Sequence, residues 1–278
     1  MIIHTAEVHG FCKGVENAVE LCEELLNKHQ GEKCYSIGEV VHNASVVDDF
    51  KRRGLEVISS PLGHEKGYAL VRAHGITPET EAEFVKAGFT IIDGTCRIVA
   101  RNHRLASEAK GPVIIVGKRG HAEVVSTAAH VRGEYFIVED VKDIDSLKVG
   151  EKYNVIVQTT FSSSVFDLIK KAIKEKGLNV SYVNNICPAS LRRREAVRKL
   201  CTFCDAIIVI GDKHSANSVE LYDIAIASGV KAYLISGAEE VTKEMVNCEN
   251  LGLTAGASVP FSIIKEVRGK IKSYGSTQ

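Results

Sequence analysis

Short runs of β-branched residues alternate with longer amphipathic stretches along most of the chain. The runs are nearly continuously apolar, and a helical stretch follows many of them. Strands of this kind are buried on both faces, as in parallel sheets covered by helices, so we expect an α/β fold. The predicted strands are 68–73, 90–93, 113–117, 135–138, 154–160, 180–185, 206–211, 232–236 and 251–256. The predicted helices are 14–29, 44–53, 78–87, 98–109, 121–131, 163–176, 189–203, 217–228 and 260–273.

Charge and hydropathy exclude two classes of protein. Lys+Arg and Asp+Glu number 35 each, so the formal net charge is zero and nucleic acid is not an expected partner. We interpret the densest basic run, LRRREAVRK at 191–199, as the solvated face of a helix. No apolar stretch reaches the roughly 18 residues of a membrane span, and the first ten residues lack a signal-peptide pattern. We expect a cytoplasmic protein with no membrane partner.

Eight cysteines are unusual for a protein of a reducing compartment, where metal and redox roles outweigh structural disulfides. Cys12, Cys96 and Cys187 each precede a predicted helix, at spacings of 84 and 91 residues. We expect each thiol at the carboxyl end of a strand, where open α/β sheets bind ligands and the helix dipole favours a thiolate. The spacing divides the chain into three α/β units, 1–96, 97–187 and 188–278.

Three thiolates leave two interpretations open. They suit an iron–sulfur cluster with one iron not held by protein, or a zinc site with an open position. Alternatively, they are strand-end cysteines packed under loops. Cys201 and Cys204 form a lone C-x-x-C in an apolar stretch, which we interpret as buried thiols.

Histidines and small polar residues gather at strand-to-loop junctions. His42, His74 and His121 predict a polar pocket that binds an anion, since imidazolium ions form near neutral pH. The Ser, Thr and Asn residues at 158–164, 214–218 and 254–258 either cap helices or bind phosphate. Glu123, two residues after His121, either relays a proton or complements a helix dipole.

Taken together, these segments resemble the LytB/IspH family of 4-hydroxy-3-methylbut-2-enyl diphosphate reductases. The matching motifs occur in order over about 250 residues. They are GFCKGV, EVVHN, RAHG, DGTC, GHAEV, QTTFS, NNIC with RREAV, SANS and TAGAS.

The resemblance implies three pseudo-symmetric α/β units with small parallel sheets around a central [4Fe–4S] cluster. Its ligands would be Cys12, Cys96 and Cys187, with one iron not ligated by protein. In that family the open iron binds the allylic hydroxyl of a small diphosphate, two electrons arrive and the C–O bond breaks. The products are isopentenyl and dimethylallyl diphosphate, the isoprenoid precursors of the non-mevalonate pathway.

The resemblance also implies a role for each polar residue. The catalytic group would be Glu123, which supplies the proton, Thr159, which orients the hydroxyl end, and His121. The histidines would also neutralise the diphosphate, while small polar side chains hydrogen-bond it. This substrate-binding set is His42, His74, His121, Ser190, Ser215, Asn217 and Ser258. An external ferredoxin or flavodoxin would donate the electrons, since the chain shows no flavin or nicotinamide motif.

Departures from the family pattern lie beside the cysteines and in the phosphate segment. Arg97 stands where proline is usual, and Ser190, Leu191 and Arg192 replace Thr-Thr-Asn. Ala216 replaces a serine, and Val125 an acid. Besides the standard reaction, they leave open a cluster-dependent reductase for a different small substrate, in which an extra arginine binds a carboxylate or phosphate. A non-catalytic redox sensor is a further alternative.

Overall fold

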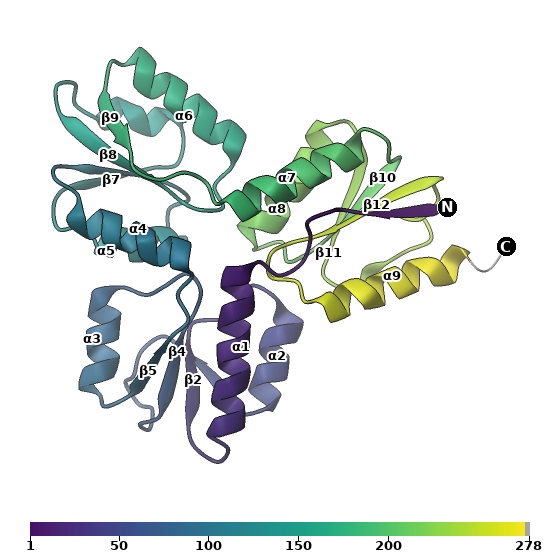
Figure 1. Ribbon diagram of the computed structural model, residues 1–278, viewed down its shortest axis with the longest axis horizontal. Helices are drawn as coiled ribbons and strands as arrows, with labels where there is room; N and C mark the ends of the chain where they lie inside the picture. The colour runs from purple at the N-terminus through teal and green to yellow at the C-terminus, as the bar shows by residue number, and fades with distance from the viewer. Residues whose placement is uncertain (276–278) are drawn as a thin grey trace. The chain divides into compact units, whose positions relative to one another are not determined.

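Three four-stranded parallel sheets organise the part of the chain that the computed structural model describes, residues 1–275 (Figure 1). Sheet A contains, in spatial order, β1 (Ile2–Thr5), β12 (Asn250–Ala255), β10 (Ala206–Ile210) and β11 (Lys231–Ile235). Sheet B contains β3 (Leu55–Ile58), β2 (Cys34–Ile37), β4 (Tyr68–Val71) and β5 (Thr90–Asp93). Sheet C contains β7 (Tyr135–Val138), β6 (Val113–Val116), β8 (Lys152–Val157) and β9 (Asn179–Tyr182). The predicted α/β class is confirmed.

Each predicted helix is present, with ends that differ by one or two residues. The helices are α1 (Lys13–Lys28), α2 (Ala44–Arg52), α3 (Pro78–Lys86), α4 (Arg97–Glu108), α5 (Ala122–Ala129), α6 (Ser163–Glu175), α7 (Pro188–Cys201), α8 (Ala216–Ala227) and α9 (Phe261–Gly275). Two short 3₁₀ helices, η1 (Val141–Ser146) and η2 (Ala238–Glu240), follow strands β7 and β11. The predicted strands are also present, but β1, β2 and β3 have no counterpart among them.

The central strands are buried on both faces, which explains their continuous apolar sequences. In β6, Ile114 and Val116 pack with Ile169 of α6, whereas Val113 and Ile115 pack with residues of α4 and α5. Successive side chains of one strand therefore enter two different cores, on opposite faces of sheet C.

The described residues form two compact units. Unit 1 combines residues 1–15, 42–46 and the chain from Pro188 onward, and it contains sheet A. Unit 2 comprises residues 16–41 and 47–187, with sheets B and C. The division at 96 and 187 stays a prediction. Sheet membership differs from it in one respect, because β1 pairs in parallel with β12, Ile2 opposite Asn250.

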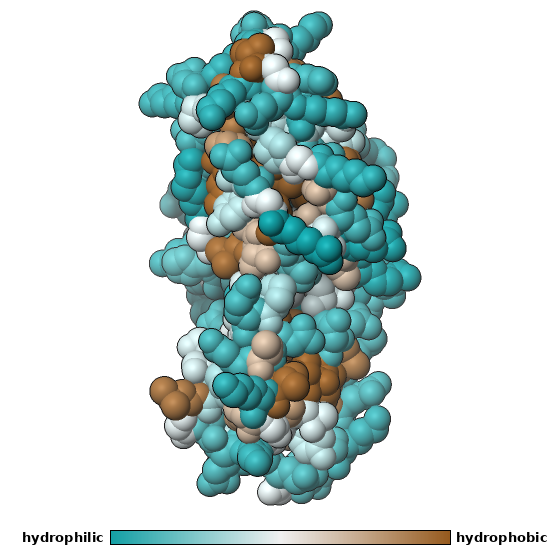
Figure 2. Space-filling model, turned by 90° about the vertical axis from the view of Figure 1, so that its left-hand side faces the viewer, coloured by the Kyte–Doolittle hydropathy of each residue, from teal (hydrophilic) through white to brown (hydrophobic). Residues whose placement is uncertain are grey.

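The described residues contain no helix that is both long and apolar enough to span a membrane. On the face shown in Figure 2, hydrophobic residues form small patches separated by hydrophilic side chains. Scattered apolar residues of this kind are normal on a protein surface.

Candidate functional site

The three cysteines that precede helices are all half-buried, and each lies between a strand and a helix. The Cys12 Sγ accepts a hydrogen bond of 3.5 Å from the backbone N–H of Val15, in the first turn of α1. Cys96 is the residue that caps α4, and its N–H donates to the carbonyl of Ala73. Cys187 directly precedes α7. All three cysteines therefore lie at or next to the N-terminus of a helix, where the helix dipole is positive.

The other cysteines are in environments that disfavour a thiolate. Burial raises the pKa of Cys22 to about 12 and that of Cys204 to about 11. Burial also raises the pKa of Cys34, Cys201 and Cys248. Of the C-x-x-C pair, Cys204 is buried, as predicted, whereas Cys201 is half-buried. None of the eight cysteines, all within the described residues, forms a disulfide.

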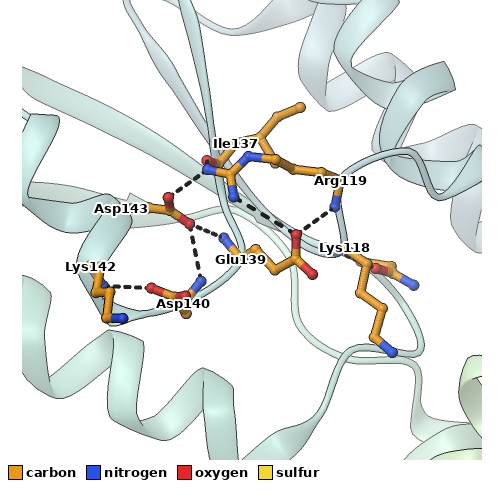
Figure 3. A network of polar contacts seen from close by, with 8 residues as sticks. Lys118, Arg119, Ile137, Glu139, Asp140, Lys142 and Asp143 are labelled. Atoms are coloured by element: carbon orange, nitrogen blue, oxygen red, sulfur yellow. Dashed lines mark hydrogen bonds and ion pairs between the residues drawn. The ribbon is translucent and has the colours of Figure 1, made fainter.

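The loop before α5 is held from two sides, which fixes His121 at the start of that helix. On one side the Lys118 N–H donates to the Gln158 side chain. On the other, Arg119 donates from its backbone to Glu139 and from its guanidinium to Asp143 and the carbonyl of Ile137 (Figure 3). Asp143 in turn accepts from the N–H groups of Glu139 and Asp140.

His121 and Glu123 occupy the first turn of α5. The His121 Nδ1 accepts a 3.2 Å hydrogen bond from the Glu123 N–H and so caps the helix. In the neutral ring this leaves the proton on Nε2. The His74 ring meets the His121 ring edge to face, with centroids 5.4 Å apart. Two of the predicted histidines therefore lie together in unit 2.

Glu123 is the most deeply buried acid of the site, with 2% of its surface exposed. Thr159 holds both carboxyl oxygens, through its N–H at 2.8 Å and its hydroxyl at 2.6 Å. Burial raises the pKa of Glu123 to about 7, although the Thr159 hydrogen bonds act to lower it. Asn102 also acts to lower this pKa, although its Nδ2 makes no hydrogen bond of ordinary geometry.

Thr159 also connects this carboxyl group to a cysteine. The Thr159 carbonyl accepts a hydrogen bond of 2.9 Å from the N–H of Cys187. Glu123, Thr159 and Cys187 therefore form one hydrogen-bonded sequence within unit 2. On the other side of α5, the Ser126 hydroxyl lies 2.9 Å from the carbonyl of His74 and 3.0 Å from the His103 ring.

Unit 1 gathers polar groups at the carboxyl ends of β10 and β12. Ser215 caps α8. Ser215, Asn217, Ser218 and Thr254 are all almost fully buried. The Asn217 Nδ2, Ser218 Oγ and Thr254 Oγ1 have no hydrogen-bond partner among the described residues. A buried polar atom without a partner is costly, so these groups favour a bound polar ligand.

The backbone of unit 1 comes close to this polar cluster. A Cβ atom added at Gly256 would lie 2.1 Å from the Ser218 Oγ, so only glycine fits there. Two residues further on, the Ser258 hydroxyl donates to the carbonyl of His42 at 3.0 Å. The Cys12 N–H donates to the carbonyl of Ala257. Unit 1 therefore brings Cys12, His42, Asn217 and Ser258 to one edge of sheet A, whereas Ser190 is buried in the first turn of α7.

The basic run at 191–199 is only partly a solvated face, so that prediction is wrong for two residues. Arg193 and Arg194 are 2% and 0% exposed. Arg193 donates to the carbonyl of Gly10, beside Cys12, and Arg194 lies 3.7 Å from the Glu220 carboxylate. Three successive arginines look alike in the sequence, and only the packing of α7 distinguishes them.

Most residues that depart from the family pattern have exposed side chains. Arg97, Val125, Leu191 and Arg192 are exposed, and Ala216 is half-buried. Within the described residues, no three or more His, Cys, Asp or Glu side chains are grouped to hold a single metal ion. The roles assigned to the site residues stay predictions.

The part of the chain that carries these motifs matches a known protein family. The model of the LytB protein family matches residues 3–272. The chain belongs to the LytB family. It is 36% identical to a 4-hydroxy-3-methylbut-2-enyl diphosphate reductase from Caldanaerobacter subterraneus, over 98% of this chain and 97% of that one. It is 34% identical to the protein of the same name from Treponema denticola, over 98% and 99%.

A solved structure of a LytB relative supports the same assignment. It is the E-1-hydroxy-2-methyl-but-2-enyl-4-diphosphate reductase from Plasmodium falciparum, 28% identical to this chain. The TM-score is 0.89, with 96% of this chain and 87% of that chain covered. The family resemblance and the α/β fold with three small parallel sheets are therefore confirmed.

Proposed function

We propose that this LytB protein is a 4-hydroxy-3-methylbut-2-enyl diphosphate reductase, which removes the allylic hydroxyl to give isopentenyl and dimethylallyl diphosphate. Curated relatives that match almost the whole chain carry that name. The observation in this chain that carries the proposal is the buried Glu123 carboxyl, bonded to Thr159 and with a pKa of about 7. An acid with a pKa near neutrality is a suitable proton donor for a leaving hydroxyl or an allyl carbon.

A [4Fe–4S] cluster is the proposed cofactor, with Cys12, Cys96 and Cys187 as ligands. The donor set fits such a group, since three half-buried thiols at helix N-termini match the preference of iron–sulfur clusters for thiolates. When bound, the cluster would relay two electrons, one at a time, from the external donor and would supply Lewis-acid activation of the hydroxyl. An external ferredoxin or flavodoxin as donor and a cytoplasmic location stay predictions.

The polar residues of this chain would bind the substrate and move a proton. His42, His74 and His121 would neutralise the diphosphate, and His121 would donate from Nε2 because its Nδ1 caps α5. The buried Asn217 amide, whose donor has no partner among the described residues, would hydrogen-bond a phosphate oxygen, and Ser215, Ser258 and Ser190 would add further hydrogen bonds. Protonated Glu123 would pass its proton through the Thr159 hydroxyl.

Turnover tests the proposed reaction. Anaerobically reconstituted protein with a strong reductant should convert 4-hydroxy-3-methylbut-2-enyl diphosphate into the two C5 diphosphates, measured by chromatography. An intact cluster and a competent reductant without turnover would contradict the reaction and favour a different substrate.

The ligand assignment has a test that does not depend on turnover. Cys12→Ser, Cys96→Ser and Cys187→Ser should each lose most of the bound iron and the broad visible absorption. Cys22→Ser is the matched control, because Cys22 is a buried thiol in α1 and should leave iron content unchanged. Equal iron content in all four variants would refute the assignment.

A further inference from the structure

Arg72 directly follows β4 in unit 2, and its side chain makes no hydrogen bond or ion pair with the described residues 1–275. Its side chain is mostly buried, and its Nε is shielded from solvent without an acceptor. Burial lowers the pKa of the guanidinium, although exposed Glu39 acts to raise it from beyond ion-pair distance. An arginine presents five N–H donors and stays charged, so leaving it without an acceptor is costly.

The Arg72 guanidinium lines a cavity of about 280 Å³ at the carboxyl edge of sheet B. Three neighbouring strands end there, and the next residue of each lines the cavity: Gly38 after β2, Ser59 after β3 and Arg72 after β4. Open α/β sheets bind their ligands at this edge.

Gly38 sets the position of the Arg72 side chain. It has a positive φ of 75°, and an added Cβ would lie 2.9 Å from the guanidinium carbon. Glycine therefore lets the arginine lie flat across the end of β2. The guanidinium therefore packs against the backbone at Gly38, and no described acidic residue forms an ion pair with it.

Two helices begin at the same cavity. Thr77 caps α3, and its hydroxyl accepts from the Thr80 N–H at 3.1 Å; both residues line the cavity. Gly120 and Ala122, at the start of α5, line it from another side. Helix N-termini attract negative charge. No acidic residue is among the described residues that line the cavity.

The rest of the lining consists of the apolar residues Ile37, Ile76 and Val125, together with Gly75 and Ser126. A cavity of this size and mixed character suits a small ligand that has one anionic end. We propose that this cavity is an oxyanion site that binds the phosphate or carboxylate group of a small, partly apolar molecule, with Arg72 as its main anchor. The site is separate from the proposed substrate-binding set, none of whose members lines this cavity.

Inorganic phosphate is the probe for a binding test. Phosphate affinity of the holo protein, measured by calorimetric titration, should fall roughly tenfold or more in Arg72→Met, as expected for loss of a charge-assisted pair. Arg72→Lys should keep part of the affinity, since lysine retains the charge but not the planar fork. Arg132→Met, a change at an exposed arginine of unit 2, is the matched control and should bind as the parent does.

Anion position separates this site from the proposed diphosphate site. Crystals soaked in sodium arsenate should show an anomalous arsenic peak within hydrogen-bond distance of the Arg72 guanidinium. The proposal would be overturned by an arsenic peak that lies only beside Asn217 or the histidines. It would also be overturned if Arg72→Met bound phosphate as tightly as the parent. If Arg72→Met fails to fold, two measurements still test the proposal. One is the arsenic position in the soaked crystals, and the other is the phosphate affinity of Thr80→Val, which should be weaker than that of the parent. None of these measurements depends on turnover, so failure of the proposed reaction would be seen separately.

Discussion

Two carboxyl groups of unit 2, Glu123 and Asp143, have opposite properties. Both accept hydrogen bonds from more than one donor. The Glu123 carboxyl is enclosed, and burial raises its pKa to about 7. The Asp143 side chain is 21% exposed and faces Arg119. Burial alone would raise the pKa of Asp143, but hydrogen bonds from Arg119 and the backbone lower it.

The difference shows that hydrogen bonds alone do not keep a buried acid ionised. Thr159 offers two neutral donors to Glu123, which do not offset the lost solvation. Asp143 has a guanidinium and partial solvent access, and it stays charged. The pKa of Glu123 is thus suited to the proposed proton transfer, whereas ionised Asp143 holds the loop before α5 through Arg119.

The two groups should also affect stability in opposite directions as pH changes. Because the folded pKa of Glu123 is raised, its stabilising contribution is complete below about 4.5 and is lost as pH rises through about 7. Because the folded pKa of Asp143 is lowered, its contribution is complete above about 3.8 and is lost as pH falls through the lower folded value.

Replacing the acid at Glu123 should have the largest effect on turnover. Glu123→Gln keeps the shape and the Thr159 contacts but has no acid, so turnover should fall by about 10²- to 10⁴-fold. Steady-state kinetics with the proposed substrate measure this. Denaturant titrations should also show a difference in stability. Between pH 5 and pH 8, the unfolding free energy of the parent should fall by on the order of 3 kcal/mol more than that of Glu123→Gln. Parent-like turnover would show that Glu123 is not the donor.

Removing a hydrogen-bond donor to Glu123 should raise the pKa of this carboxyl group. Thr159→Val removes the hydroxyl, which acts to lower the pKa of Glu123, so this pKa should rise further. The alkaline limb of the pH–rate profile should then shift to higher pH, and turnover should fall about tenfold with the lost relay. Thr159→Ser is the control that restores the hydroxyl and should restore the profile. If the alkaline limb of the pH–rate profile does not move in Thr159→Val, the Thr159 hydroxyl does not affect the pKa of Glu123.

Replacing the acid at Asp143 should lower the stability of the fold. Asp143→Asn loses the charge that Arg119 and two backbone N–H groups stabilise, so unfolding free energy should fall by about 1 kcal/mol at neutral pH. The difference should narrow as pH falls, because the parent acid also becomes protonated. Asp145→Asn, at an exposed position in η1, is the control. A constant difference down to acidic pH would contradict the charge-based explanation.

The smallest expected effect is at Asn102. Its Oδ1 accepts from the Asn184 amide, so its Nδ2 is turned away from Asn184, and the side chain lowers the pKa of Glu123. Asn102→Leu should raise that pKa, by less than Thr159→Val does, and shift the pH–rate profile in the same direction. A shift to lower pH would show that Asn102 acts on Glu123 in another way.

Local patterns predicted most elements but not every position within them. The strands β1, β2 and β3 were not predicted because polar or charged residues interrupt their short apolar runs. The motif residues lie at strand ends and helix starts, as expected, because loops there follow from local sequence. The burial of Arg193 and the pocket of Arg72 depend on which elements pack together, which no short stretch encodes.

The pairing of β1 with β12 has a consequence for synthesis. The first strand of the chain needs a partner almost 250 residues away, whereas sheets B and C are built only from residues 34–182. Contacts between distant segments form slowly because a long loop must close first. Domains made of continuous chain fold as they emerge, so sheets B and C can form on the ribosome before sheet A does. The loop that carries Cys12 therefore acquires its native neighbours only when the last strand has been made.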